Sequence, residues 1–460
     1  MDILAFNEVV NRAVYGEWMM LLFILVGLYL SFRTGFPQFS RLGIALRETV
    51  GAIRERFLSF GGQITPFQAA MVAMSGTIGT GHIIGMVGAV IIGGPGAVLW
   101  MWIAYLVGMA TKFAEAVLAV HFRRQYTDGS VLGGPMVYIR YGLGKRLAWL
   151  AALFALFTAI AAFGIGNLSQ AGAVGAAFAQ EFNVPPAITG VLLAVLVGIL
   201  LAGGIRLIAR FAQVIVPLKL GLFLLGILPL LFIHIGDIPA AMVLIVSSAF
   251  SFQAAAGGAA GAAVALGLAE ILKAGVGRGI FANEAGLGSA AIAHAQAQVD
   301  HPVRQGFWGL TEMLVSLLVT TLMALTFIAS GFWQRFLGGD RVEAARFLFA
   351  EHPLGVAVLG LILAVFALGT MVSWGFYGEE GAAYLFGEGI RWPYRLTFVA
   401  FAFVGPLGGL AALTSVADTL NGLMAIPNLI ALIALGGLVG RLVREFFGGM
   451  PWQPPKEEDE

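Results

Sequence analysis

The sequence predicts an all-α polytopic membrane protein with eleven transmembrane helices, and three observations lead to this class. Hydrophobic residues make up 59% of the 460 residues and charged residues only 11%, whereas about a quarter of a soluble domain is charged. The mean hydropathy is +0.91. The apolar residues also form long runs that match the roughly 30 Å thickness of a bilayer core. These features exclude a soluble globular protein.

Eleven apolar runs are long enough to cross a membrane, and the seventh is the least regular. They cover residues 15–32, 66–92, 95–121, 147–178, 186–203, 207–234, 262–297, 303–331, 353–386, 394–416 and 425–446. Residues 239–254 are apolar but short, so we expect an interfacial or re-entrant segment there. Arginines scattered among apolar residues predict an amphipathic helix on the cytoplasmic surface over residues 37–62. Residues 448–460 have too little apolar surface to fold, and we expect a free tail.

Lysine and arginine are concentrated on one side of the expected membrane. The loops on that side carry most of the 26 basic residues, whereas the other side carries Arg12, Arg335, Arg341 and Arg346. The positive-inside rule therefore places the amino terminus outside and the carboxyl terminus in the cytoplasm. The first apolar run lacks a small-residue cleavage site, so we expect it to be retained. The predicted location is the inner (plasma) membrane, with lipid as the surrounding partner.

Composition also excludes several classes of function. The net charge is +1 and the basic residues are scattered, so there is no electrostatic footprint for nucleic acid. The absence of cysteine excludes disulfides, thiol nucleophiles and cysteine-ligated metals. The six histidines show no metal-binding spacing, and the sequence contains neither a nucleophile elbow nor a phosphate loop. We therefore expect no enzyme activity, which leaves a carrier or a passive channel.

Residues 73–96 form an apolar span whose middle is unusually rich in glycine. The glycines are Gly76, Gly79, Gly81 and Gly85. Each costs a continuous helix roughly 1 kcal/mol relative to alanine. Unwound backbone persists in a bilayer only where protein covers it or where it lines a cavity, so the span predicts a binding site at the membrane midplane. Thr77, Thr80 and His82 supply polar side chains there. The alternative is that the glycines only allow two helices to pack closely.

A second span of the same kind lies five crossings later, at residues 277–290. Two interrupted helices separated by five spans are typical of an inverted 5 + 5 repeat that holds substrate between the half-helix ends. Half-helix amino termini suit a carboxylate, and unwound carbonyls suit a small cation. Two alternatives remain open: Asn283 and Glu284 lie in a water-exposed loop, or the break lies within 254–275, near Gly257 and Gly258.

Seven segments resemble successive motifs of the alanine/glycine:cation symporter family, and together they are specific. They are Gly76-Thr77-Ile78-Gly79-Thr80-Gly81, Gly93-Gly94-Pro95-Gly96-Ala97, Gly108-Met109-Ala110-Thr111-Lys112-Phe113-Ala114-Glu115, Gly164-Ile165-Gly166-Asn167, Phe281-Ala282-Asn283-Glu284-Ala285-Gly286-Leu287-Gly288-Ser289, Trp374-Gly375-Phe376-Tyr377-Gly378-Glu379 and Asn421-Gly422-Leu423-Met424-Ala425-Ile426-Pro427-Asn428. The resemblance implies a leucine-transporter-type 5 + 5 core at residues 66–446. One extra transmembrane helix and the amphipathic helix precede it within 1–65, and a disordered cytoplasmic tail follows at 447–460. It also implies import of alanine or glycine driven by sodium.

The same resemblance assigns binding residues in three groups. The first break would receive the substrate carboxylate and a cation through Thr77, Gly79, Gly81 and His82. The pocket would be closed by Asn167, Gln170, Phe281 and Trp374. A sodium site would be completed by Thr370 and Ser373. The alternative for both hydroxyls is a structural hydrogen bond to their own helix. No cofactor is expected apart from a bound sodium ion.

Three residues depart from the family pattern and bear on the coupling ion. His82 stands where the family has asparagine, Lys219 where it usually has an apolar residue, and Ser316 where it usually has aspartate. Imidazole nitrogen is a poorer partner than amide oxygen for a hard cation, and it titrates near neutral pH. An intramembrane lysine is costly unless it is paired or neutral. Together the departures suggest that the Lys219 ammonium replaces sodium, with proton coupling or cation-independent exchange.

Each of these interpretations has a structural alternative. Lys219 would then snorkel to the cytoplasmic interface, and His82 would be a neutral histidine satisfied by a backbone carbonyl. Lys112 and Glu115, three residues apart, are expected to pair on one helix face. Glu312, Glu379 and Glu380 lie near span ends or cavities, where a carboxylate is suited to relay protons.

Overall fold

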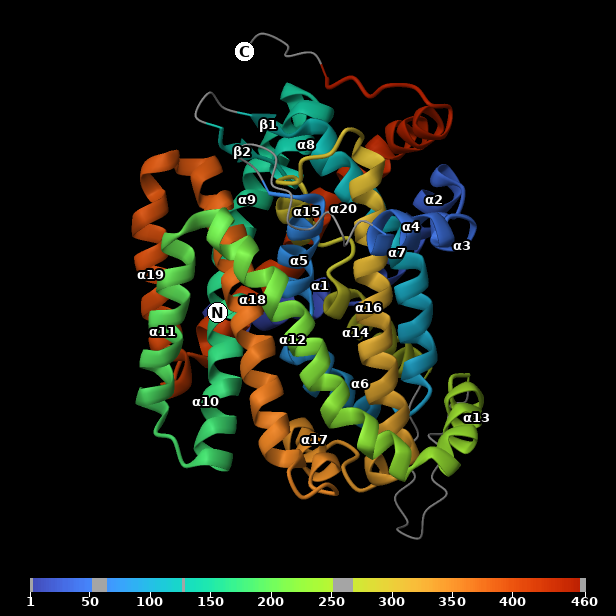
Figure 1. Ribbon diagram of the computed structural model, residues 1–460, viewed down its shortest axis with the longest axis vertical. Helices are drawn as coiled ribbons and strands as arrows, with labels where there is room; N and C mark the ends of the chain where they lie inside the picture. The colour runs from blue at the N-terminus through green and yellow to red at the C-terminus, as the bar shows by residue number, and fades with distance from the viewer. Residues whose placement is uncertain (1–2, 52–63, 126–128, 251–267, 456–460) are drawn as a thin grey trace.

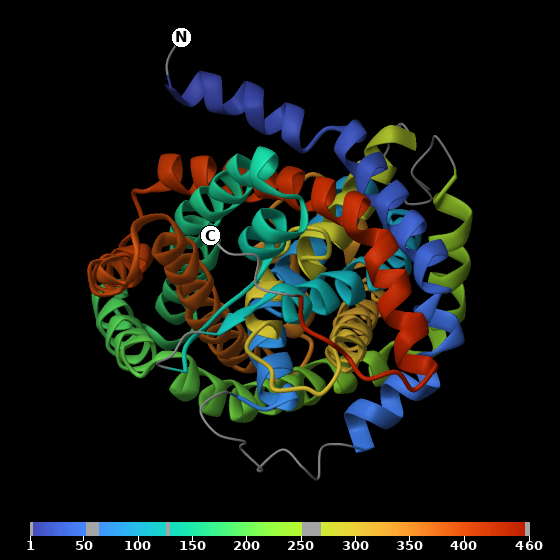
Figure 2. The same cartoon turned by 90° about the horizontal axis from the view of Figure 1, so that it is seen from above.

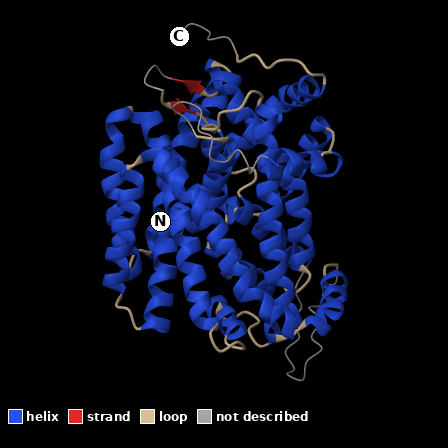
Figure 3. Ribbon diagram, in the orientation of Figure 1, coloured by secondary structure: helices blue, strands red, loops and turns tan. Residues whose placement is uncertain are grey.

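The structure, a computed structural model, describes residues 3–51, 64–125, 129–250 and 268–455. Within these ranges the chain is almost entirely helical (Figure 3), and β1 (Arg124–Gln125) pairs antiparallel with β2 (Val131–Leu132). The helices are α1 (Ile3–Val14), α2 (Glu17–Thr34), α3 (Pro37–Ser40), α4 (Leu42–Val50), α5 (Pro66–Thr77), α6 (Ile84–Gly93), α7 (Ala97–Phe122), α8 (Pro135–Gly142), α9 (Ala148–Phe163), α10 (Ser169–Phe182), α11 (Pro186–Ala202), α12 (Gly204–Ile233), α13 (Ile238–Ser248), α14 (Leu268–Asn283), α15 (Ser289–His294), α16 (Pro302–Ala329), α17 (Arg341–Phe349), α18 (Gly355–Phe386), α19 (Arg391–Val404) and α20 (Ala411–Phe447).

The long helices run side by side along the long axis of the molecule, and α5, α6, α14 and α15 lie among them (Figure 1). In the described chain, seven helical segments are long and apolar enough to cross a membrane, and one bent pair makes an eighth. The seven are Leu4–Thr34, Ala97–Phe122, Lys145–Phe182, Gly204–Ile233, Pro302–Ala329, Gly355–Phe386 and Ala411–Phe447. Two further apolar helical segments are shorter, Pro186–Ala202 and Ile235–Ser248. The predicted class, a helical polytopic membrane protein, is therefore found.

The carboxyl-terminal helices differ from the predicted runs. The chain turns between α19 and α20, and α20 then continues without interruption through residues 417–424, where a loop was expected. The expected bounds 394–416 and 425–446 were therefore wrong. Polar residues in that stretch suggested a loop, but Asp418 and Thr419 face α1, where both accept hydrogen bonds from Asn11. Seen from the end of the bundle, α1 lies along its edge beside α20 (Figure 2).

Two of the smaller predicted segments have helical counterparts. α13 covers most of the short apolar stretch predicted at 239–254. α3 and α4 cover the first half of the predicted amphipathic helix at 37–62, and its second half lies outside the described residues.

The first glycine-rich span is broken as predicted. α5 begins with a capping box, in which the Thr65 hydroxyl and the Gln68 side chain each accept a hydrogen bond from the other residue's backbone amide at 3.1 Å. It ends at Thr77, and a short 3-10 turn over Thr80–His82 leads into α6. The two halves of the span are bent by 61°. α5 and α6 therefore do not form one continuous helix, and the carbonyl end of α5 and the amide end of α6 both lie at the break.

The second glycine-rich span is broken at residues 284–288, between α14 and α15. Glu284, Gly286 and Gly288 all have positive φ, at +57°, +91° and +83°, and a non-glycine residue adopts this conformation at a cost. The Asn283 side-chain oxygen accepts from the Ala285 amide at 2.8 Å and supports the turn. Residues 268–275 are helical within α14, and the alternative position near Gly257 and Gly258 lies outside the described residues.

The glycines of the first span also serve close packing, so both interpretations of them hold. An added Cβ at Gly76 would lie 3.0 Å from the Tyr377 hydroxyl, and one at Gly79 would lie 2.6 Å from the Thr370 hydroxyl. Both neighbours are on α18. The break and the close approach of α18 thus occur at the same place in the bundle.

A charged cluster fastens α18 to α19. The Glu379 carboxylate accepts two hydrogen bonds from Arg395, both at 2.6 Å, and one from Arg391 at 3.0 Å. Arg391 also donates to Glu380 at 2.6 Å. Both carboxylates are almost completely buried. Glu379 and Glu380, which the sequence suggests as proton relays, are thus engaged in ion pairs between two helix ends.

Replacing Glu379 by glutamine should destabilise this junction. The neutral amide cannot balance two arginines, and removing one partner of a buried ion pair costs about 3 kcal/mol. We expect the midpoint of thermal unfolding in detergent to fall below that of the parent protein. Glu388→Gln removes a carboxylate that also pairs with Arg391 but whose side chain is 73% exposed, and it should change the midpoint little. Equal midpoints for the two variants would contradict this role of Glu379.

Candidate functional site

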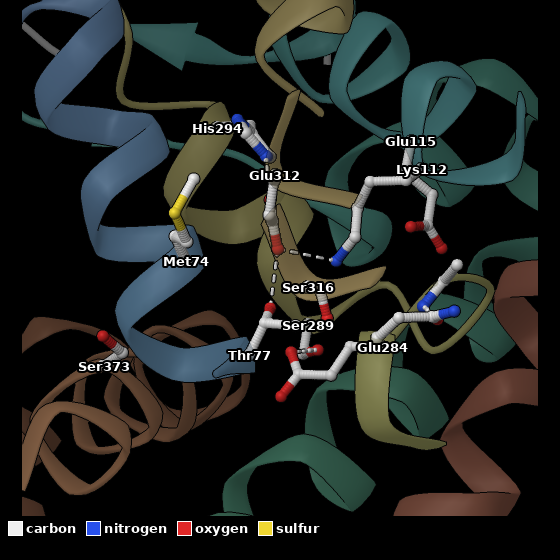
Figure 4. A network of polar contacts seen from close by, with 12 residues as sticks. Met74, Thr77, Lys112, Glu115, Glu284, Ser289, His294, Glu312, Ser316 and Ser373 are labelled. Carbon is white, nitrogen blue, oxygen red and sulfur yellow. Dashed lines mark hydrogen bonds and ion pairs between the residues drawn. The ribbon is translucent and has the colours of Figure 1, made fainter. Parts of the chain in front are cut away.

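Two half-helices from the glycine-rich spans, α5 and α15, are joined by the buried carboxylate of Glu312 on α16 (Figure 4). Its Oε1 accepts a hydrogen bond from the Thr77 hydroxyl at 2.7 Å and lies 3.2 Å from the Lys112 ammonium. Its Oε2 lies 3.1 Å from Nε2 of His294. Thr77 is the last residue of α5, and His294 is the last residue of α15. One side chain therefore holds the half-helices on the two breaks together.

His294 lies between Glu312 and the side-chain amide of Gln305. The Gln305 amide nitrogen is 2.8 Å from Nδ1 of His294. In this assigned orientation the amide donates to Nδ1, so Nε2 carries the proton that is donated to Glu312. The Gln305 oxygen, also buried, has no hydrogen-bond partner among the described residues.

Lys112 pairs with Glu312 rather than with Glu115, so the predicted pairing within one helix face was wrong. The Glu115 carboxylate instead accepts from the Gly286 amide at 2.9 Å and from the Asn428 side chain at 2.7 Å. The spacing of Lys112 and Glu115 allows contact between them, but each side chain reaches a different neighbouring element. Lys112 thus supports the first break through Glu312, and Glu115 supports the second break directly.

Trp374 on α18 reaches the second break through Glu284. Its indole nitrogen donates to one carboxylate oxygen of Glu284 at 3.0 Å, and the Ser289 hydroxyl donates to the other at 2.5 Å. Glu284 is 5% exposed, so the alternative of a water-exposed loop at this position does not hold. Phe281, one turn earlier, is only partly buried and packs its ring 4.5 Å from that of Tyr15.

The two predicted residues of the fourth run are placed differently. The Gln170 oxygen accepts from the Thr80 hydroxyl at 2.9 Å and would lie 3.4 Å from a Cβ at Gly79, so Gln170 belongs to the first break. The Asn167 amide donates to the Phe398 carbonyl on α19 at 2.7 Å. Asn167 lies in a π-helical turn at Gly164–Leu168. Its hydrogen bond fastens that turn to α19 rather than contributing to either break.

The Lys219 ammonium is fully buried at the carbonyl end of α5. It donates to the carbonyls of Ile78 at 2.7 Å and Ser75 at 3.1 Å, and lies 3.5 Å from that of Met74. The Thr370 hydroxyl from α18 lies 3.2 Å from the Gly76 carbonyl, in the same set of carbonyls. The snorkelling alternative for Lys219 is therefore wrong.

The predicted sodium-site hydroxyl of Ser373 lies one helical turn away from this ammonium. It donates to the Val72 carbonyl at 2.9 Å. Thr370 and Ser373 thus both bond to the backbone of α5, a neighbouring helix, although Thr370 also lies 3.2 Å from the Phe366 carbonyl of its own helix. The alternative role of these hydroxyls, a structural hydrogen bond to their own helix, is therefore found in part for Thr370.

Two of the departures from the family pattern contact each other. The His82 Nε2 lies 2.6 Å from the Ser316 hydroxyl, and the Tyr105 hydroxyl lies 3.1 Å from the same oxygen. The His82 side chain is therefore bonded to the Ser316 hydroxyl, and it also interacts with the Gly79 carbonyl, as the structural alternative proposed. Among the described residues, no group of three or more histidine or acidic side chains is arranged to hold a metal ion.

Several residues of the site were not assigned roles from the sequence. Glu284 lies inside the second glycine-rich stretch, His294 follows it, and Gln305 lies in the first turn of α16. Arg278 lies one turn before Phe281, and its guanidinium donates to the carbonyl of Gly81 on the first break. The sequence signal that could have identified Arg278 is its position inside the second glycine-rich stretch.

The sequence profile of the Sodium:alanine symporter family matches residues 2–454. The sodium/alanine symporter AgcS of Methanococcus maripaludis is 41% identical over 451 residues, covering 95% of this chain and 96% of that protein. The probable sodium/glutamine symporter GlnT of Bacillus subtilis is 32% identical, with 95% and 89% coverage. The crystal structure of MhsT in complex with L-phenylalanine superposes with a TM-score of 0.57 at 11% identity, covering 84% of this chain and 99% of that one.

Replacing Glu312 by glutamine should leave the Lys112 ammonium buried without a counter-charge. Such a loss costs about 3 kcal/mol, and we expect a lower midpoint of thermal unfolding and at least a tenfold loss of substrate uptake per folded protein. Removing both charges in Lys112→Met/Glu312→Gln should recover part of the stability but not the uptake. Glu343→Gln on the exposed surface of α17 serves as the control. A Glu312→Gln variant as stable as the parent would contradict this assignment.

Proposed function

This chain belongs to the Sodium:alanine symporter family, and from that premise we propose that it imports small neutral amino acids, alanine or glycine, by alternating access. The family and the similar proteins named above are transporters and not enzymes. The observation that carries the proposal is the pair of broken helices, whose half-helices are joined by Glu312. Half-helix ends at the midplane are how such carriers hold a zwitterion.

The proposed architecture has eleven transmembrane helices, with a 5 + 5 inverted repeat preceded by one extra helix. It counts α5–α6 and α14–α15 each as one broken span, and it adds the shorter α11 and α19 as crossings. The transport core is residues 66–446, and the amino terminus is outside the cell. The proposal is supported by the fold similarity to MhsT, by the bent span α5–α6 and by the interruption between α14 and α15.

The proposed pocket lies between the breaks and α18. The amide end of α6 suits the substrate carboxylate, because helix amino termini carry partial positive charge. Gln170 bonds to Thr80 at the first break, and Trp374 bonds to Glu284 at the second. Trp374 would form an apolar wall that suits a one-carbon side chain, whereas the Phe281 ring packs against Tyr15 and Phe23.

The coupling ion has two candidates, and the first is sodium, as in the name of the family. The carbonyls at the end of α5 and the Thr370 hydroxyl are oxygen ligands of the kind that a small hard cation takes. Sodium would be a transported partner here and not a cofactor.

The second candidate is proton coupling or cation-independent exchange, with Lys219 in place of the sodium ion. The observation that favours it is the Lys219 ammonium, which already donates to the α5 carbonyls. The family pattern has asparagine and aspartate at two further positions, and both residues would suit a cation. Here His82 and Ser316 stand at those positions and contact each other. The candidate carrier of a coupling proton is His294, whose ring lies between the Glu312 carboxylate and the Gln305 amide.

Alanine counterflow should test the carrier mechanism against a passive channel. Proteoliposomes preloaded with unlabelled alanine should take up labelled alanine faster than empty ones. The reason is that a carrier which has released labelled alanine inside binds unlabelled alanine there and returns with it to the outside. Preloading with leucine should have little effect if the pocket selects small side chains. Labelled uptake that is linear in concentration and unaffected by preloading would reject the carrier.

Separate ion gradients should decide between the two coupling candidates. Because Lys219 occupies the carbonyls, we expect alanine uptake to persist when sodium is replaced by potassium and to rise with an inward proton gradient. His294→Gln should remove the proton stimulation, whereas His352→Gln in an exposed loop should keep it. Uptake that requires an inward sodium gradient and ignores the pH gradient would reject the second candidate and leave the first.

A further inference from the structure

One face of α6 carries glycines that make room for arginines from two other helices. An added Cβ at Gly81 or at Gly85 would overlap the guanidinium of Arg278 from α14, and one at Gly88 would lie 3.3 Å from the Arg341 side chain of α17. The three glycines are four and three residues apart, so they lie on one face of the helix. Two arginines thus lie against this face. α6 itself runs from the break toward the end of the bundle opposite the carboxyl terminus (Figure 1).

Arg278 is poorly neutralised for a charge at this depth. Its guanidinium donates to the Gly81 carbonyl, and its Nε has no hydrogen-bond partner in the described part of the chain. It makes no ion pair with any described carboxylate. A guanidinium has five donor hydrogens, and a buried charge is costly unless an opposite charge balances it. The position therefore suits an anion that is not part of the protein.

Asp418 does not take that place. It is close enough to Arg278 and Arg341 to interact with both electrostatically. Its carboxylate, however, accepts hydrogen bonds from Asn11 at 3.2 Å and from the Tyr15 hydroxyl at 3.0 Å. The amino-terminal helix thus holds this carboxylate away from direct pairing with the arginines.

The backbone beside Arg278 offers further donors. The amides of Thr80 and Gly81, in the 3-10 turn that precedes α6, have no acceptor among the described residues. α6 contributes the partial positive charge of a helix amino terminus at the same point. A guanidinium and two free amides thus lie at the first break, and both kinds of donor prefer a carboxylate or a similar small oxyanion.

We infer that Arg278 binds the carboxylate of the transported amino acid against the amide end of α6. The inference rests on the proposed function, because it identifies the anion as the carboxylate of that substrate. Arg341 lies farther along the same glycine face and is exposed, so it raises the local concentration of the anion without fixing it.

The test compares alanine with alaninamide, which keeps the ammonium and the methyl group but has no carboxylate. Binding of labelled alanine to the purified full-length protein is measured directly, and alaninamide is measured by competition. The parent should prefer alanine. In Arg278→Gln, alanine should bind about tenfold to a hundredfold more weakly, as expected for the loss of a charge-assisted hydrogen bond, while alaninamide binding should change less than about threefold.

Three variants separate a binding role from a structural one. Arg278→Lys keeps the charge and should retain part of the preference for alanine. Arg335→Gln removes an exposed arginine that lies over the Phe347 ring instead of the glycine face, and it should leave the preference unchanged. Arg341→Gln should weaken alanine binding only at low ionic strength, because the interaction of an exposed charge is screened by salt.

The outcomes distinguish the inference from the function on which it rests. Loss of the alanine preference in Arg278→Gln, with partial retention in Arg278→Lys, supports the inference. Equal weakening of alanine and alaninamide, or no weakening of either, overturns it and leaves the carrier function standing. Should Arg278→Gln fail to fold, the Arg278→Lys variant decides. If that variant binds both alanine and alaninamide tenfold more weakly and its preference for alanine is unchanged, the inference is also overturned. A parent protein that binds no alanine overturns the proposed function and the inference together.

Discussion

The structure depends on one fully buried carboxylate, that of Glu312, and on the donors that compensate it. The Thr77 hydroxyl, the Lys112 ammonium and the His294 ring reach it from three different elements. Because an uncompensated charge in such surroundings is expensive, α5, α7 and α15 cannot separate from α16 one at a time. The half-helices that end at the two breaks are therefore held in a fixed relation, although neither is continuous with a full span.

Breaking a helix in a membrane frees backbone groups, and the surrounding chain uses them in opposite ways at the two ends. At the end of α5 the freed carbonyls face Lys219 and the Thr370 hydroxyl, both of which are donors. In the turn before α6 the amides of Thr80 and Gly81 have no acceptor among the described residues, and the Arg278 guanidinium donates to the Gly81 carbonyl of the same turn. The first break thus separates a region that attracts cations from one that attracts anions within a few residues.

The sequence predicted the breaks well, because several glycines clustered in the middle of an apolar span weaken a continuous helix at that point. It predicted the contacts poorly, because they join residues far apart in the chain. His82 and Ser316 were each recognised as unusual, but nothing in one sequence indicates that their side chains meet at 2.6 Å. Local spacing also misled, since Lys112 and Glu115 can pair on their own helix yet each binds a different neighbour. The end of α19 was misplaced because nothing in the sequence indicates that the half-buried Asp418 bonds to α1 from within a continuous helix.

The ammonium at the end of α5 has an energetic consequence. A sodium ion in that position would cross the membrane with its substrate, and each turnover would then carry one positive charge through the electric field, worth about 2.3 kcal/mol per 100 mV. A side-chain nitrogen remains attached to the protein. With a zwitterion as cargo, this position contributes no net current, so the transmembrane voltage does no work there. Accumulation would have to draw on concentration differences alone, unless another group in the cycle carries charge across.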